Sequence, residues 1–288
     1  MPELPEVEVV KRSLKSKIQN LVIKKVKIND SKLRYKLTNK EFTKITGLKI
    51  KKIERKSKFL LFLLDKFFVI LVHLGMTGKF FFLDQKNQKY KTSFYYSLSN
   101  KDYKHDRVIF HLGNGQKLIY NDVRKFGFIK ILSKKNYKNN FHLNNLGPEP
   151  LEKKYKFDYF KEYISGKNRS IKDLLMDQRF VSGLGNIYVN EILFLSKVRP
   201  TRKIQTLKNY EILKIINFTK KILIKAIKNG GASIRDFSSI NGKKGFFQQK
   251  FKVYGREGKN CSNIDCNASI FKIPISNRSS FFCKRCQK

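Results

Sequence analysis

The sequence predicts an α+β protein of several domains, in which an N-terminal helix and an antiparallel β-sandwich precede a helical domain and a C-terminal β-hairpin. Three observations support this prediction. Short β-branched and aromatic runs fill residues 21–132. Apolar residues recur with a helical period over residues 151–251, and all four cysteines lie within residues 252–288. Between the first two domains, residues 133–150 carry few apolar side chains and are predicted to be a linker.

The first domain is predicted to begin with a helix. Pro5 suits an opening helical turn, and Glu6 and Glu8 suit the positive end of the helix dipole. Apolar side chains then recur at spacings of three and four residues, at Val7, Val10, Leu14 and Ile18.

The pattern then changes to one that predicts strands. The runs occupy residues 21–28, 59–64, 67–72, 80–83, 94–98, 108–112, 117–120 and 126–132. Turn residues such as Gly113-Asn114-Gly115 separate most of them, so we expect an antiparallel sandwich or barrel. In the second domain the spacing predicts helices at residues 157–164, 171–176, 186–196 and 207–228. Gly230 and Gly231 are expected to end the last of these.

The charge balance favours a polyanionic partner. The chain has 63 lysines and arginines against 22 acidic residues, a formal net charge of +41. Double-stranded DNA is the densest common polyanion, although we attribute about half of the excess to a compositional bias of the genome. No apolar run reaches the roughly 18 residues of a membrane span, and the acidic, proline-rich start is unlike a signal peptide. We therefore expect a soluble, cytoplasmic protein.

The cysteines have the spacing of a metal site. Cys261 and Cys266 form one close pair, and Cys283 and Cys286 form a second. Two such pairs supply the four thiolates of a structural Zn²⁺ site, whereas disulfides or unpaired thiols are the alternative in an intracellular protein. We interpret residues 253–254 and 281–282 as strands of the hairpin that carries this zinc finger.

Several motifs in fixed order resemble those of the formamidopyrimidine-DNA glycosylase family, from end to end. They are PELPEVE at residues 2–8, HLGMTG at 73–78, DVRKFG at 122–127, LGPEPL at 146–151, GLGNIY at 183–188 and VYGR at 253–256. The resemblance implies a monomeric, bifunctional DNA glycosylase and abasic-site lyase that excises oxidised purines from double-stranded DNA. It also implies a helix-two-turns-helix arrangement in the helical domain, and one structural zinc ion.

The resemblance assigns the catalytic role to Pro2, Glu3, Lys58 and Arg278. Removal of Met1 would free a secondary amine on Pro2, and an α-amino group with a pKa near 8 is partly neutral at neutral pH. Its alternative role, starting the helix, fits Pro5 better. Glu3 matches the family acid that moves protons. Lys58 and Arg278 match residues that bind phosphates and assist β- and δ-elimination.

Two further acidic residues follow in the same motif. Glu6 is expected to orient its neighbours by a hydrogen bond. Glu8 is interpreted as a solvated residue of the first helical turn.

Further residues match the family's DNA contacts. Met76, Arg124 and Phe126 would fill the gap left by an extruded nucleotide, with core packing of the two apolar side chains as the alternative. His105, Asn168, Lys172 and Asn186 complete the predicted contacts. Asn186 could instead be a helix N-cap that needs no ligand, and His73 a structural histidine.

Three departures from the family pattern matter. Four residues separate Cys261 from Cys266, where two are usual. Asn168 stands where a basic residue is common, and Lys167 or Arg169 could replace it. Residues 232–243 resemble the loop that covers the extruded base, and their sequence does not rank 8-oxoguanine against formamidopyrimidines.

Two other functions remain as alternatives. An endonuclease VIII-like enzyme for oxidised pyrimidines shares the amine chemistry but usually has glycine where Leu4 stands. A non-catalytic DNA-binding protein with a zinc ribbon would not need Pro2, Glu3 and Lys58 together.

Overall fold

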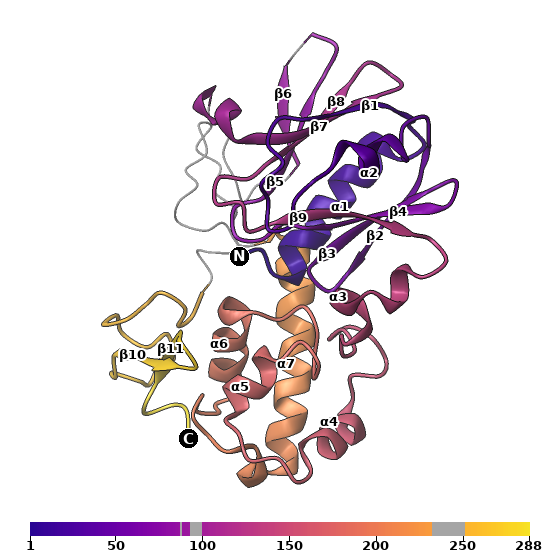
Figure 1. The fold of residues 1–288 in the computed structure, drawn as a ribbon. Helices are drawn as coiled ribbons and strands as arrows, with labels where there is room; N and C mark the ends of the chain where they lie inside the picture. The colour runs from indigo at the N-terminus through magenta and orange to yellow at the C-terminus, as the bar shows by residue number, and fades with distance from the viewer. Residues whose placement is uncertain (87, 93–99, 232–250) are drawn as a thin grey trace. The chain divides into compact units, whose positions relative to one another are not determined.

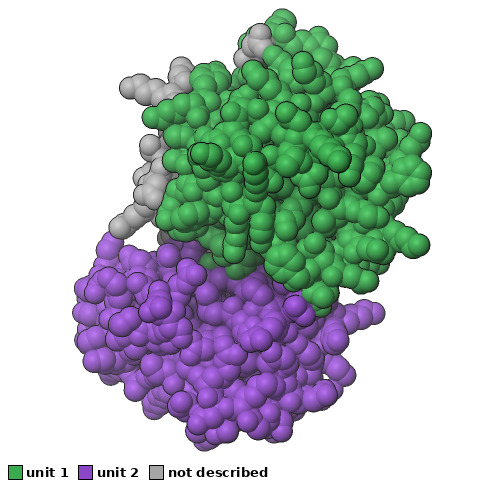
Figure 2. Space-filling model, viewed as in Figure 1, with its two compact units in different colours: residues 1–144, 227–248 green, residues 145–226, 249–288 purple. Residues whose placement is uncertain are grey.

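The computed structural model describes residues 1–86, 88–92, 100–231 and 251–288 (Figure 1). The predicted strand at 94–98 and the predicted loop at 232–243 lie outside these residues. Two compact units are present, coloured separately in Figure 2: residues 1–144 with 227–248, and residues 145–226 with 249–288. The boundary at residue 144 falls inside the predicted linker, which carries η2 (Tyr137–Asn139) and α3 (Phe141–Asn144). A separate domain for residues 252–288 stays a prediction.

The first unit contains two antiparallel sheets in the described residues. One has the strand order β1 (Ile23–Ile28), β7 (Asp106–Leu112), β8 (Lys117–Asn121), β5 (Lys79–Leu83) and β6 (Lys89–Lys91). The other has the order β2 (Ile50–Lys56), β3 (Phe59–Leu64), β4 (Phe68–His73) and β9 (Phe128–Ser133). Short helices α2 (Asn39–Thr43) and η1 (Asn100–His105) connect strands.

Helix α1 (Leu4–Ile18) supplies an apolar stripe to the core of this unit. The four predicted stripe positions are fully buried, in a cluster that contains side chains of both sheets. The predicted helix and antiparallel sandwich are therefore confirmed. Burial of this stripe fixes the start of α1, and with it residues 2 and 3, against the sheets.

The second unit is helical with a terminal hairpin. Its elements are α4 (Phe157–Ile164), α5 (Ile171–Met176), α6 (Asn186–Leu195), η3 (Ile204–Thr206), α7 (Asn209–Lys228), β10 (Ile270–Ile275) and β11 (Arg278–Cys283). The four predicted helices are confirmed to within two residues. Helix α7 ends before Gly230 and Gly231, which have the positive φ values of 78° and 82° that glycine tolerates.

One strand prediction in this unit is wrong. The hairpin pairs β10 with β11, and residues 253–254 are not part of it. The backbone N–H groups of Val253 and Tyr254 instead donate to Glu191 Oε1, each at 2.9 Å. Within the described residues, no helix combines the length and the apolar character that crossing a membrane requires.

Candidate active site and metal centre

The amino terminus is held at the start of α1. Glu3 is the N-cap residue, and Glu6 Oε2 accepts its backbone N–H at 2.9 Å as part of a reciprocal capping box. Pro2 and both carboxylates are buried. Glu6 thus has the orienting hydrogen bond expected of it.

A cavity of about 460 Å³ lies at this terminus. Its lining residues are Met1, Arg34, His73, Gly75, Met76, Arg124, Lys125 and Phe126. Because Met1 precedes Pro2 directly, removal of Met1 would create the Pro2 amine next to this cavity. The first unit therefore places the residue that precedes the predicted nucleophile in one cavity with the three predicted gap-filling residues.

Lys58 lies in the tight turn between β2 and β3, where Ser57 has a φ of 55°. The Arg55 guanidinium fixes this turn, since Nη1 donates to the Ser57 carbonyl and Nε donates to Glu8 Oε2, both at 2.9 Å. Arg55 thereby ties the turn that carries Lys58 to the helix that follows Pro2 and Glu3.

The interpretation of Glu8 as a solvated residue is wrong. Glu8 is buried and forms ion pairs with Lys11 at 2.7 Å and with Arg55 at 2.9 Å. Burial raises the pKa of the Glu8 carboxyl, but Lys11 and Arg55 outweigh it and hold the pKa below its usual range. The sequence hid this role because Arg55 lies 47 residues away along the chain.

Met76, Arg124 and Phe126 form one exposed group. Arg124 Nη1 lies 3.3 Å from Met76 Sδ, and its guanidinium lies over the Phe126 ring at 4.6 Å. Met76 is 40% exposed and Phe126 is 47% exposed, so neither is a core residue. The core-packing alternative is therefore wrong, and the geometry suits side chains that meet an external partner.

His73 has the properties of a structural histidine. Its Nδ1 accepts the Gly75 N–H at 3.1 Å, and its ring stacks on Phe128. Burial, then the charges of Lys58 and Arg34, lower the His73 pKa to about 4. The ring is therefore neutral at neutral pH, with its proton on Nε2.

His105 ends η1 and belongs to a charged network. Its Nδ1 lies 3.1 Å from Arg107 Nη2, and Arg107 Nη1 pairs with Asp30 at 2.8 Å. Asp30 also pairs with Lys125, between Arg124 and Phe126, at 2.7 Å. The network links His105 to the segment that carries two of the predicted gap-filling residues, Arg124 and Phe126.

The second unit brings Lys172, Asn186 and Arg278 together. Lys172 is 1% exposed, and its Nζ donates to Ser280 Oγ at 2.6 Å and to the Ser279 carbonyl at 3.0 Å. Burial lowers the Lys172 pKa to about 8. Asn186 Nδ2 donates to the same Ser279 carbonyl at 2.9 Å. Both side chains therefore brace β11 beside Arg278, which is exposed.

Asn186 is not a helix N-cap. Gly185 has that position and Asn186 is the first residue of α6, so the N-cap alternative is wrong. Instead, the Asn186 side chain crosses to the hairpin, a contact between residues 93 positions apart in the chain.

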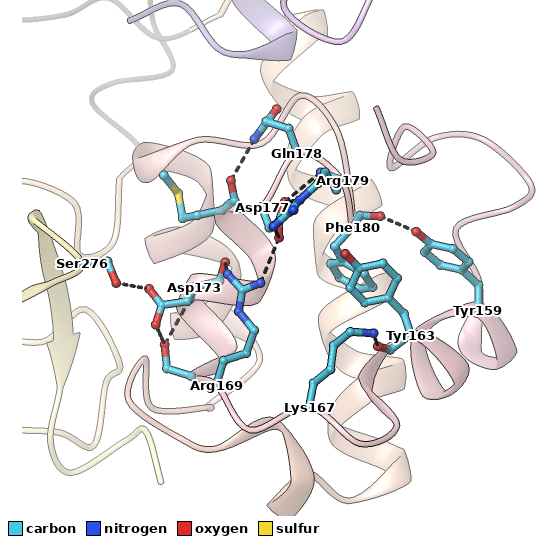
Figure 3. Close-up of polar contacts among 12 residues, drawn as sticks. Tyr159, Tyr163, Lys167, Arg169, Asp173, Asp177, Gln178, Arg179, Phe180 and Ser276 are labelled. Carbon is cyan, nitrogen blue, oxygen red and sulfur yellow. Dashed lines mark hydrogen bonds and ion pairs between the residues drawn. The ribbon is translucent and has the colours of Figure 1, made fainter. Parts of the chain in front are cut away.

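Figure 3 shows Lys167 and Arg169, the two basic residues that flank Asn168 in the sequence, with their polar contacts. Asn168 is exposed, and Lys167 Nζ bonds to the Tyr163 carbonyl. Arg169 pairs with Asp177 at 2.9 Å and donates to the Asp173 carbonyl at 2.6 Å. Asp177 thus engages Arg169, while the Tyr163 carbonyl and ring engage Lys167.

The four cysteines form a cluster that fits a metal ion. Their sulfur atoms all lie within 4.8 Å of one another, with 3.8 Å between Cys261 and Cys286 and 3.6 Å between Cys266 and Cys283. Zinc bonded tetrahedrally to sulfur at about 2.3 Å requires sulfur–sulfur separations of roughly 3.8 Å. The donor set and its spacing therefore suit Zn²⁺.

The longer loop between the first two cysteines is accommodated outside this cluster. Ile264 is 98% exposed and Asp265 is also exposed, so these two residues bulge outward. Asn263 turns inward, where its Nδ2 lies 3.0 Å from Cys286 Sγ, and the Ser262 hydroxyl is buried. The extra residues thus leave Cys261 and Cys266 in the cluster.

Two buried carboxylates with several donors each were not found from the sequence. Glu191 accepts backbone N–H groups of residues 252, 253 and 254, and so joins α6 to the segment before the cysteines. Asp122 accepts hydrogen bonds from Thr77 and Gly127. Asp122 lies inside a motif that resembles the family, but nothing in the local pattern reveals which donors it meets.

The chain is similar to one family along most of its length. Residues 1–129 match the formamidopyrimidine-DNA glycosylase N-terminal domain, and residues 146–238 match the formamidopyrimidine-DNA glycosylase H2TH domain. A formamidopyrimidine-DNA glycosylase of Rickettsia africae is 40% identical over 287 residues, which cover 100% of this chain and 99% of the relative.

Solved structures give the same result. A point mutant of the Lactococcus lactis FPG in complex with a Fapy-dG containing DNA has a TM-score of 0.85 and 33% identity. MutM in complex with carbocyclic 8-oxo-G containing DNA also has a TM-score of 0.85 and 33% identity. Each comparison covers 100% of both chains.

Proposed function

Since this chain belongs to the formamidopyrimidine-DNA glycosylase family and is a DNA glycosylase of oxidised-purine repair, we propose that it is bifunctional. It excises 8-oxoguanine and formamidopyrimidines through a Schiff base on Pro2, and then cleaves the strand as an abasic-site lyase by β,δ-elimination. The observation that carries this proposal is the cavity at the amino terminus, lined by Met1 together with Met76, Arg124 and Phe126.

The proposed chemistry begins at the Pro2 amine. Its lone pair attacks C1′ of the damaged nucleotide, the bond from C1′ to the base breaks, and the base leaves with a proton supplied through Glu3. Opening of the sugar ring leaves an iminium between Pro2 and C1′. Loss of a proton from C2′ then expels the 3′-phosphate, and a second elimination expels the 5′-phosphate. Lys58 and Arg278 bind these phosphates as they leave.

The proposed substrate is double-stranded DNA, bound by a monomer. Two structural neighbours described above are complexes with DNA that contains Fapy-dG or a carbocyclic 8-oxo-G, which supports oxidised purines as the lesion class. Extrusion of the nucleotide leaves a gap in the stack. Met76 and Phe126 hold that gap open, while Arg124 pairs with the orphaned cytosine. His105, Asn186 and the segment at Asn168 contact the DNA backbone.

One structural Zn²⁺, held by Cys261, Cys266, Cys283 and Cys286, completes the proposal. When bound it supplies folding free energy to the hairpin. The chain's own residues then present Arg278, since Lys172 and Asn186 hold the strand that begins with it.

Two lesions test the substrate class. We expect a duplex with 8-oxoguanine opposite cytosine to be cleaved at least ~10-fold faster than one with thymine glycol, because Arg124 pairs with cytosine. The product should be a one-nucleotide gap with phosphates on both sides, as resolved by denaturing electrophoresis. Preference for thymine glycol would favour the pyrimidine enzyme, and an intact abasic product would exclude the lyase. Binding without any cleavage would favour the zinc-ribbon binder.

Salt dependence tests Arg278. If Arg278 makes one phosphate contact, Arg278→Ala should reduce the slope of log K against log salt by about one unit. Lys272→Ala is the matched control, because Lys272 lies in the same hairpin but pairs with Glu257 at 3.0 Å. Fluorescence anisotropy over a salt series measures both slopes. Equal slopes for wild type and Arg278→Ala would remove Arg278 from the phosphate contacts.

A further inference from the structure

The three gap-filling residues come from two separate loops, 74–78 and 122–127, and one buried carboxylate bonds to both. Asp122 is fully buried, and its Oδ1 accepts the Thr77 hydroxyl at 2.5 Å. Its Oδ2 accepts the Gly127 N–H at 2.9 Å. The first bond reaches the loop of Met76, and the second closes the loop of Arg124 and Phe126 on itself.

The Thr77 hydroxyl extends this arrangement to Arg124. Its Oγ1 accepts the Arg124 backbone N–H at 3.0 Å while it donates to Asp122. One hydroxyl of the first loop therefore fixes the backbone position of Arg124, the residue that pairs with the opposing base in the proposed function. Thr77 uses both its donor and an acceptor position, which valine cannot reproduce and serine can.

The surroundings leave this network little freedom. A Cβ on Gly75 would lie 2.4 Å from the Gly127 nitrogen, so the two loops touch backbone to backbone. The buried Tyr120 hydroxyl lies 3.4 Å from the His73 carbonyl and 3.5 Å from Asp122 Oδ2. Arg107 Nε also donates to the Asp122 carbonyl at 2.9 Å.

We propose that Asp122 is the positioning residue that joins the two loops, so that Met76, Arg124 and Phe126 enter the DNA stack as one rigid unit. This inference rests on the proposed function, because it assigns a cause to the geometry of residues that act there on DNA. A buried carboxylate without hydrogen-bond donors costs free energy. The loop arrangement that supplies the Thr77 and Gly127 donors to Asp122 is therefore favoured over arrangements that do not. Asp122 touches no reacting atom in this role and sets opposite-base selectivity through Arg124.

Two readouts separate positioning from general folding. Excision of 8-oxoguanine requires the base to be extruded, and extrusion depends on the gap-filling residues. Borohydride trapping on a duplex with a preformed abasic site requires no base extrusion, so it depends less on them. We expect Asp122→Asn and Thr77→Val each to slow single-turnover excision by roughly tenfold, with a loss of trapping below about twofold. The preference for cytosine over adenine opposite the lesion should fall with excision, because Arg124 loses its register.

The network also predicts rescue and coupling. Thr77→Ser should excise within about twofold of wild type, because serine retains the hydroxyl. The double variant Asp122→Asn/Thr77→Val should lose little more than the worse single variant, since both substitutions disrupt the same hydrogen-bond network. A 2-aminopurine placed next to the opposing cytosine should show a smaller fluorescence increase on binding Asp122→Asn or Thr77→Val than on binding wild type, because the variants open the base stack less. Thr92→Val is the matched control, as it removes a buried hydroxyl that donates to the Phe80 carbonyl, outside both loops.

Several results would overturn the inference. Equal losses of excision and trapping would show that Asp122 serves the fold alone. Normal excision in Thr77→Val, or a Thr77→Ser as slow as Thr77→Val, would exclude the hydroxyl bridge. Wild-type protein with no activity on any oxidised purine would instead defeat the proposed function, and this inference with it. Should Asp122→Asn fail to fold, Thr77→Val and Thr77→Ser decide the question.

Discussion

Borohydride reduction of the protein during its reaction with an 8-oxoguanine duplex is expected to yield one covalent adduct, at residue 2. An ordinary α-amino group has a pKa near 8, so a useful fraction of such an amine is neutral at neutral pH, whereas an ordinary lysine is about two units more basic. As a secondary amine, proline forms an iminium without losing a further proton, and hydride converts it to a stable amine. Mass spectrometry of the amino-terminal peptide should find the nucleotide remnant there.

Blocking the amine gives the sharpest form of this test. A chain whose first residue cannot be removed carries Pro2 as an amide, which is not nucleophilic, and trapping should fall by at least ~1000-fold. Pro2→Gly is the matched control, because it restores a free, primary amine at the same position and should give a measurable adduct. An adduct on Lys58, or on any other lysine, would contradict the assignment.

Most of the fold could be predicted because local periodicity and burial agree. Helix α1 followed from spacings of three and four, and its stripe is fully buried. Strand β2 was not predicted. Its residues, IKKIERK, are mostly charged, and its register shifts between Ile50 and Lys52, which puts the buried Ile50 and Ile53 three residues apart. A bulge at a sheet edge removes the alternation from which strands are recognised.

The site could be predicted only where the motif itself names the residue. Pro2 and Glu3 follow from the opening motif, and the structure adds their fixed position at α1. Lys172 was expected on the DNA, yet its side chain is buried against β11, about 107 positions away in the sequence. Such long-range hydrogen bonds depend on how helices and the hairpin pack, which local pattern does not encode.

The second large effect is expected from removal of the metal. Freshly purified protein should contain one zinc per chain, and a strong chelator should release it and abolish DNA binding. Arg278 begins strand β11, which ends in Cys283, so we expect the position of Arg278 to depend on a metal ion held at the cysteine end of the hairpin. Metal analysis and fluorescence anisotropy on the same sample measure the two quantities. Re-addition of Zn²⁺ should restore both.

The rest of the protein should stay folded through this treatment. The β-sandwich has a core of its own, which contains no cysteine. The core around the hairpin, by contrast, includes Cys261, Cys266 and Cys283 together with Phe281. Circular dichroism should therefore report only a small change. Global unfolding on chelation would contradict this expectation.

Magnitudes decide whether the hairpin could keep Arg278 in place without metal. Lys172, Asn186 and Asn190 hold β11 through hydrogen bonds of 2.6–3.0 Å, each with a net stabilisation of about 1 kcal/mol, or somewhat more for the charged lysine. A structural zinc site contributes an apparent 10–16 kcal/mol, roughly, to the folding of a small domain. These hydrogen bonds are therefore too weak to replace the ion.

Ile264→Ser, in the exposed bulge, is the matched control and should retain zinc and DNA binding, whereas Cys286→Ser should lose both. Active, freshly purified protein without zinc would defeat this prediction, because the hairpin would then stand without metal.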